Sequence, residues 1–129
     1  MVLRKNTSYM DGYYGLPAGK SEWFEPFSKG AAREAKEEAG IDIEPKNLKF
    51  VHIVHRHGES EIEQKFMDWV DVYFEASSWA GEPYNAEEHK SERLDWLDIN
   101  NLPKNIVPPQ LSALEHIAKG INYSEYGWN

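Results

Sequence analysis

Residues 19–41 read GKSEWFEPFSKGAAREAKEEAGI, and this stretch predicts the clearest element of the chain. Its second half is rich in Ala, Glu, Lys and Arg, residues that favour helices. Pro26 suits the first position of a helix, and Gly40 suits the residue that ends one. We therefore expect a helix from Pro26 to Ala39, and before it a loop over 5–20 whose geometry depends on glycine.

Three glutamates of this helix, Glu34, Glu37 and Glu38, should project together. At 100° per residue they fall within a sector of roughly 100°, whereas Ala35 and Ala39 can line a different, close-packed face. Like charges four residues apart destabilise an isolated helix by a few tenths of a kcal/mol unless a cation compensates. Helices of this composition are usually only solvated surfaces, so the spacing of the surrounding residues is decisive.

That spacing carries a family resemblance. Gly19, five residues, Glu25, seven residues and then RE-A-K-EE-A-G-I match the Nudix box, G-x5-E-x7-R-E-U-x-E-E-x-G-U with U apolar, at every fixed position. Residues 79–97 look like the later loop and strand of MutT-like nucleoside triphosphate pyrophosphohydrolases. The chain thus resembles the Nudix hydrolases over most of its length.

The resemblance implies a metal site at the glutamates. Glu37 and Glu38 would be the principal ligands, and Glu34 would be a further ligand or the carboxylate that orients water. The backbone carbonyl of Ala18 would also reach the metal, although relatives more often have glycine there. Oxygen ligands of this kind suit Mg²⁺, with Mn²⁺ as a substitute, better than zinc.

Other positions of the box are expected to support the site. By the same resemblance, Arg33 would pair with Glu25 and fix the loop on the helix, and Gly19 and Gly40 would be structural. In MutT-like relatives a glutamate of the later loop completes the metal or base cluster. Glu87 is predicted for that role, with Glu88 as the alternative. If neither glutamate has a function, the segment is simply an acidic surface loop.

The expected reaction is hydrolysis of a P-O-P linkage by water, with a nucleotide as the small-molecule substrate. By analogy, the substrate would be a nucleoside triphosphate, cleaved to the monophosphate and pyrophosphate. Two alternatives remain open at this stage. One is removal of pyrophosphate from an RNA 5′ end, and the other is a Nudix-fold module that binds a nucleotide without turning it over.

Base recognition should involve aromatic side chains opposite the metals. Five are available on the predicted strands and loops: Phe66, Trp69, Tyr73, Trp79 and Trp96. An aromatic residue on a strand is usually part of the core, so each is a weak candidate taken alone. His52, His55 and His57 share one predicted strand, which would present them on one face, either as a partly exposed surface or as metal ligands.

The length and composition of the chain limit its domain organisation, its partners and its location. At 129 residues the chain should form one domain, 1–129. Its net charge of −8 disfavours binding to duplex DNA, which requires a basic face. No apolar run approaches the length needed to span a membrane, so we expect no association with a membrane. The N-terminus does not resemble a signal peptide, and the lack of cysteine permits a reducing compartment, so a cytoplasmic location is expected.

The remaining pattern predicts strands over 2–4, 48–57 and 65–76, the last two paired antiparallel across a polar link at 58–63. Other expected segments are a short strand or turn over 41–47, a loop over 81–85, a strand over 94–97 and a second helix over 110–119.

This order of elements implies an α+β fold, an α/β/α sandwich of the Nudix type with a mixed sheet. Family members usually have a longer first strand than this chain provides before Arg4. A short first strand would leave a sheet edge open, which favours either aggregation or a homodimer.

Overall fold

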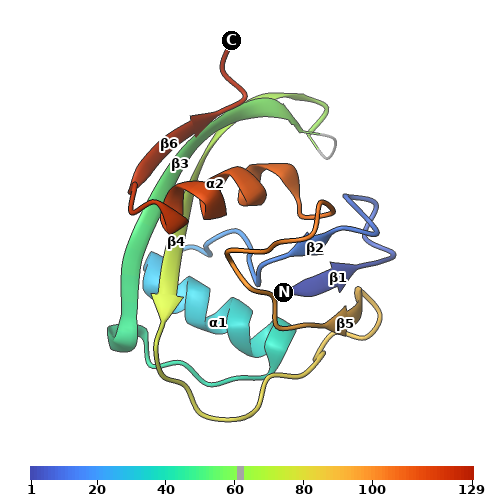
Figure 1. Ribbon diagram of the computed structural model, residues 1–129, viewed down its shortest axis with the longest axis vertical. Coiled ribbons are helices and arrows are strands. Elements are labelled where there is room, and N and C mark those ends of the chain that lie inside the picture. The colour runs from blue at the N-terminus through green and yellow to red at the C-terminus, as the bar shows by residue number, and fades with distance from the viewer. Residues whose placement is uncertain (61–62) are drawn as a thin grey trace.

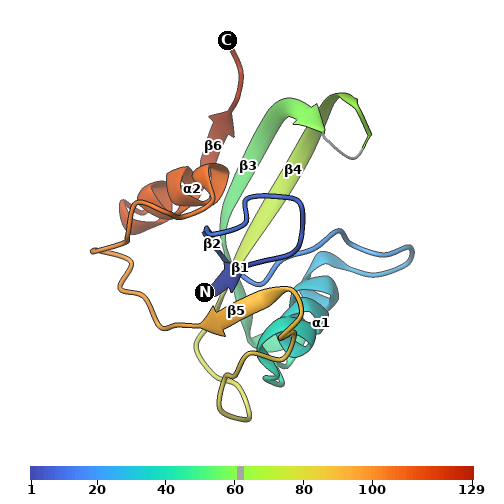
Figure 2. The ribbon, with the colours of Figure 1, turned by 90° about the vertical axis from the view of Figure 1, so that its right-hand side faces the viewer.

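The computed structural model describes residues 1–60 and 63–129. Two helices lie on opposite sides of the strands (Figures 1 and 2). In chain order the elements are β1 (Val2–Arg4), β2 (Tyr14–Gly15), α1 (Phe27–Ala39), the 3-10 helix η1 (Pro45–Asn47), β3 (Leu48–Ser60), β4 (Lys65–Ala76), β5 (Ser91–Leu94), α2 (Pro108–Ala118) and β6 (Tyr123–Tyr126). The expected α+β class is confirmed, including the short first strand.

The strands form two sheets of three. One has the order β2-β1-β5 and is antiparallel throughout. The other has the order β4-β3-β6, with β3 antiparallel to β4 and parallel to β6, so this sheet is mixed. The predicted antiparallel pairing of residues 48–57 with 65–76 is confirmed.

Strand β3 differs from its prediction in two respects. A register shift between Phe50 and His52 interrupts the expected alternation, and the strand continues through Ser60, which pairs with Lys65. The polar link predicted over 58–63 was therefore wrong for residues 58–60, because close pairing with β4 keeps them extended. Residues 61 and 62 of that link lie outside the described residues.

The strand predicted over 94–97 was also wrong, because β5 covers Ser91–Leu94. Its position depends on β1, since Val2 pairs with Leu94 and Arg4 pairs with Ser91. The amino group of Met1 donates a hydrogen bond to the carbonyl of Asp95 at 2.6 Å, and that residue's amide donates back to Met1 at 2.8 Å.

Several smaller features were displaced or missed. Helix α1 begins at Phe27, because Pro26 is still extended with ψ 149°, and it ends at Gly40, whose φ is 69°. Helix α2 begins two residues earlier than predicted, with proline in its first turn, and it ends at Ala118. Strands β2 and β6 were not predicted, and of the strand or turn expected over 41–47 the structure has a turn, the 3-10 helix η1.

The most buried side chains join the two sheets to the helices. Leu3 and Tyr14 pack against Ile106, while Val54 of β3 is 1% exposed. Helix α2 contacts β3 and β6, and α1 contacts β4. Nowhere in residues 1–60 and 63–129 is a helix both long and apolar enough to cross a bilayer.

Candidate active site

Helix α1 turns its glutamates outward because its small residues face inward. Ala35 is 6% exposed and Ala39 is 3% exposed, so both lie in the packed interior. Gly40 then ends the helix in the left-handed conformation, and its amide donates to the carbonyl of Lys36 at 3.0 Å. The sector expected to carry the glutamates is left facing a pocket.

This acidic pocket has a volume of about 510 Å³. Four glutamates line it together with residues of β1, the β1–β2 loop, the segment after β2 and the start of β5. The lining residues are Ala18, Glu34, Glu37, Glu38, Glu87, Val2, Arg4, Asn6, Thr7, Lys90, next to β5, and Ser91. The structure therefore brings together the carboxylates and the loop alanine that were predicted as site residues. Arg4, Asn6, Thr7 and Lys90 were missed, since nothing in their local sequence separates them from ordinary surface residues.

Glu87 reaches this pocket because its loop is hydrogen-bonded to the end of α1. The amide of Tyr84 donates to the carbonyl of Ala39 at 3.0 Å, and the amide of Ala86 donates to the carbonyl of Glu38 at 3.2 Å. The side-chain amide of Asn85 donates to the carbonyl of Ser91 at 2.7 Å, which closes the loop onto β5.

The alternative, Glu88, is exposed and does not line the acidic pocket. Of the two neighbours, only Glu87 is therefore placed to act with the helix glutamates.

Arg33 ties the preceding loop to the helix. Its Nε donates to Oε2 of Glu25 at 2.8 Å and its Nη2 donates to Oε1 at 3.1 Å, which makes the contact bidentate. The same guanidinium donates to the carbonyl of Lys20 at 3.3 Å and to Oε1 of Glu34 at 2.8 Å. The pairing of Arg33 with Glu25 implied by the resemblance is present in the structure.

Glu38 has the most strongly raised pKa among the carboxyl groups of the pocket. Its pKa is raised to about 8, chiefly by burial and further by the neighbouring carboxylates of Glu34 and Glu87, against the opposing effect of a hydrogen bond from Ala18. That bond joins the Ala18 amide to Oε2 at 2.7 Å. Burial also raises the pKa of Glu34, against the opposing effect of Arg33. The surroundings of Glu38 therefore oppose a negative charge on this carboxylate.

The sequence of this chain matches a known family. The sequence model of the NUDIX domain matches residues 1–117. The chain belongs to the Nudix hydrolase family.

Two relatives illustrate the match. The uncharacterized Nudix hydrolase YvcI of Bacillus subtilis (strain 168) is 31% identical over 113 residues, which cover 84% of this chain and 66% of that protein. The match therefore spans slightly less than two thirds of that relative's length. The crystal structure of a MutT NUDIX hydrolase from Burkholderia pseudomallei has a TM-score of 0.73 at 30% identity, covering 88% of this chain and 83% of that one.

Within the Nudix box, Gly19 has a steric role. A Cβ atom at this position would overlap the carboxylate of Glu34. A side chain at residue 19 would therefore displace the Glu34 carboxylate from its present position. The close approach of the loop to the helix also brings Ala18 within hydrogen-bonding distance of Glu38.

The donor set of the Nudix glutamates suits a hard divalent cation, because every side-chain donor is a carboxylate oxygen. Across the part of the chain that the structure describes, no three His, Asp or Glu side chains already converge to enclose a metal ion. Arg33 holds two of the glutamates, since its Nη1 lies 2.8 Å from Glu34 and 3.3 Å from both carboxylate oxygens of Glu37. Closing the set around a cation would require Glu37, whose side chain is 50% exposed, to turn away from the guanidinium.

The three strand histidines do not share one face. His52 is fully buried, with its ring nitrogens 2.8 Å from the carbonyl of Ile121 and 2.7 Å from Oγ of Ser124. His55 and His57 lie on the opposite face, where both rings contact Trp128. The prediction of a shared face was wrong because strand neighbours alternate sides, and 52 and 55 differ in parity.

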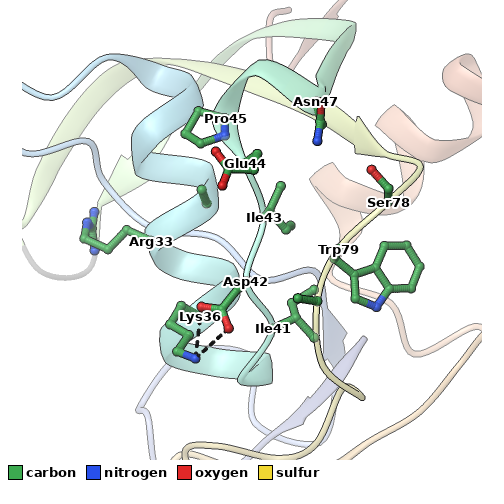
Figure 3. A pocket seen from close by; sticks show the side chains of 12 residues that line it. Arg33, Lys36, Ile41, Asp42, Ile43, Glu44, Pro45, Asn47, Ser78 and Trp79 are labelled. Atoms are coloured by element: carbon green, nitrogen blue, oxygen red, sulfur yellow. Dashed lines mark hydrogen bonds and ion pairs between the residues drawn. The ribbon is translucent and has the colours of Figure 1, made fainter.

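None of the five aromatic candidates for base stacking lines the acidic pocket. Trp79 lines a larger cavity of about 630 Å³ on another side of α1 (Figure 3). There Lys36 pairs with Asp42 at 3.1 Å, and Arg33 also contributes to the lining. We place the candidate site in the smaller pocket, because four glutamates converge there, whereas only Asp42 and Glu44 supply carboxylates to the larger cavity.

Proposed function

We propose that this chain hydrolyses the diphosphate linkage of a nucleotide, most simply a nucleoside triphosphate to the monophosphate and pyrophosphate. The proposal rests chiefly on the convergence of Glu34, Glu37, Glu38 and Glu87 in one polar pocket. If α1 were only a solvated surface helix, a fourth carboxylate from a distant loop would not be expected beside its glutamates. The likeness to Nudix hydrolases supports the same reaction class.

A divalent cation, Mg²⁺ or Mn²⁺, would be held by Glu37 and Glu38, with Glu34, Glu87 and the carbonyl of Ala18 as further candidates. When bound, such a cation neutralises phosphate charge and lowers the pKa of water. The burial of Glu38 beside the carboxylates of Glu34 and Glu87 supports this assignment independently of the family. Without a cation, four carboxylates would repel a polyphosphate.

The protein side chains would orient the water and take its proton. The water oxygen forms a bond to phosphorus, the P-O bond to the leaving phosphate breaks, and a carboxylate of the pocket accepts the proton released. Glu34 is suited to orient the water, because Arg33 fixes its carboxylate from one side. Arg4 and Lys90 add positive charge at the same pocket, where phosphate oxygens would lie.

The test is product identification from a panel of nucleoside triphosphates and diphosphate-linked nucleotides, incubated with Mg²⁺ or Mn²⁺ and separated by ion-exchange chromatography. We expect a nucleoside monophosphate and pyrophosphate in equal amounts. Tight nucleotide binding without product in either metal would instead identify a binding module. An RNA with a 5′ triphosphate belongs in the panel, because cleavage of a long RNA would depend more steeply on salt.

Glu87 and Glu88 form a matched pair for mutagenesis. We expect Glu87→Gln to lower kcat/KM at least about tenfold, because it removes a carboxylate from the acidic pocket. Glu88→Gln removes the same charge from an exposed site and should change kcat/KM by less than about twofold. Steady-state hydrolysis of the preferred nucleotide measures both values. Equal effects of the two substitutions would contradict a specific role for Glu87.

Arg33→Lys should lower kcat/KM by about 10–100-fold, the range typical of residues that orient a ligand. Lysine keeps the charge but cannot make the bidentate contact with Glu25 while also holding Glu34. Lys36→Met, on the same helix, is the control, because its exposed contact with Asp42 lies outside the acidic pocket. Full activity of Arg33→Lys in steady-state assays would show that charge alone suffices.

A further inference from the structure

Strand β4 has a free edge. It lies at the end of its sheet, beside β3 and away from β6 (Figure 2). Among the described residues, no backbone group of β4 bonds to any segment other than β3. A strand of 12 residues with an open row of backbone donors and acceptors is a template for pairing with another strand.

The usual devices that protect an edge strand are weak here. The sequence of β4, KFMDWVDVYFEA, contains neither proline nor glycine. Its two central carboxylates are held toward β3: Asp71 pairs with Arg56 at 2.8 Å, and Asp68 pairs with His57 at 2.7 Å. Asp71 is thereby paired with a cation and Asp68 is hydrogen-bonded within the chain, which weakens both as barriers to an approaching strand.

The exposed apolar residues of β4 lie on one face of the sheet. Phe66 is 70% exposed and Val70 is 58% exposed, and both have the parity that faces away from buried Val54. Exposed apolar side chains beside an open strand edge favour a partner that supplies both backbone groups and apolar contacts.

We propose that two copies of this chain associate through β4, paired antiparallel about a two-fold axis at Val70. In that register Val70 faces its own copy, Phe66 faces Phe74 of the partner subunit, and Lys65 faces Glu75 of the partner subunit. Every charged pair formed across the new edge is then of opposite sign. The β4-β3-β6 sheets of the two subunits then form one continuous sheet of six strands.

Neighbouring registers are less favourable. A shift of one residue in one direction places Asp68 opposite Asp71 of the partner subunit, and like charges directly opposed destabilise a sheet. A shift in the other direction replaces the contact between Lys65 and Glu75 with one between Lys65 and Ala76. Either shift also pairs residues of opposite parity, which breaks the continuity of the apolar face.

Sedimentation velocity over a range of protein concentrations measures the association. We expect a monomer–dimer equilibrium for the natural chain. Val70→Asp should weaken it at least about tenfold, because two carboxylates would meet at the axis with Cα atoms roughly 4.5–5.5 Å apart. Val70 does not line the acidic pocket, so hydrolysis and thermal unfolding of the variant check that it is folded. A chain that stays monomeric, or a dimer that survives this substitution, overturns the proposal.

Cysteine cross-linking tests the register itself, since the chain contains no cysteine. Val70→Cys should form a disulfide-linked dimer under mild oxidation, because the expected Cα separation lies within the usual range of about 4.4–6.8 Å. Glu75→Cys is the control on the same strand. Its two copies would lie roughly 34 Å apart, so alone it should not cross-link, whereas mixing it with Lys65→Cys should. Equal cross-linking of Val70→Cys and Glu75→Cys overturns the register.

Discussion

Replacing Glu38 by glutamine is expected to lower kcat by roughly a thousandfold, which corresponds to about 4 kcal/mol of transition-state stabilisation. Glutamine has a similar shape but lacks the negative charge that our proposal requires for holding the cation. Steady-state hydrolysis of the preferred nucleotide with Mg²⁺ measures the loss. Glu44→Gln, at an exposed site outside the acidic pocket, is the control and should retain full activity.

The same substitution should stabilise the cation-free protein at alkaline pH. In the folded chain burial raises the Glu38 pKa from 4.5 to about 8, so the folded state holds a proton that the unfolded chain has released over this interval. The contribution of Glu38 to the free energy of unfolding is therefore most favourable below about pH 4.5, and it is lost as the pH rises toward about 8. Glu38→Gln removes this loss and should raise the free energy of unfolding by roughly 2 kcal/mol at pH 8.

Urea unfolding in the presence of a chelator, at several pH values, measures the difference. Added Mg²⁺ should raise the Tm of the natural chain and have a much smaller effect on Glu38→Gln, because ligands that bind only the folded state stabilise it. If glutamine leaves activity intact, or if it destabilises the cation-free chain at pH 8, the assignment of Glu38 as a buried cation ligand is wrong.

Replacing Gly40 by alanine is expected to destabilise the chain by about 3 kcal/mol and to lower the Tm by roughly 10 °C. Two effects combine. Gly40 has φ 69°, a conformation that costs other residues roughly 1–2 kcal/mol, and an added Cβ would overlap the ring of Tyr84. Because Tyr84 begins the segment that leads to Glu87, we also expect activity to fall.

Gly120→Ala is a matched control for this prediction. Gly120 has a similar φ of 73° at the end of the other helix, but nothing lies within 4 Å of an added Cβ. Its cost should therefore be the conformational penalty alone. Combining Gly40→Ala with Tyr84→Ala should recover the part due to the ring, as measured by a double-mutant cycle of unfolding free energies. Equal losses for Gly40→Ala and Gly120→Ala would contradict a steric role for Tyr84.

Local sequence predicted the long elements well. Helix α1 lies within one residue of its prediction, because Pro26 and Gly40 act on the backbone through their own conformations. Strand β4 agrees with its predicted range at both ends. These signals are carried by neighbouring residues and do not depend on the rest of the fold.

The short strands were less predictable, because pairing defines them. Strand β2 has two residues and β6 has four, and both are too short for a periodic pattern to be informative. Strand β5 begins and ends where β1 can pair with it, which displaced it from residues 94–97. The parity of the strand histidines likewise became clear only once β3 was paired with β4 and β6.

The candidate site, too, was predicted in part by the sequence and decided in part by the tertiary structure. The sequence alone determined that Glu34, Glu37 and Glu38 share a sector of one helix, because the geometry of a helix depends only on residue spacing. Only the tertiary structure decided that Glu87, and not Glu88, reaches the acidic pocket, because backbone hydrogen bonds from the distant loop to the end of α1 fix its position. It also decided that the pKa of Glu38 is raised, since desolvation depends on every group packed around a carboxylate.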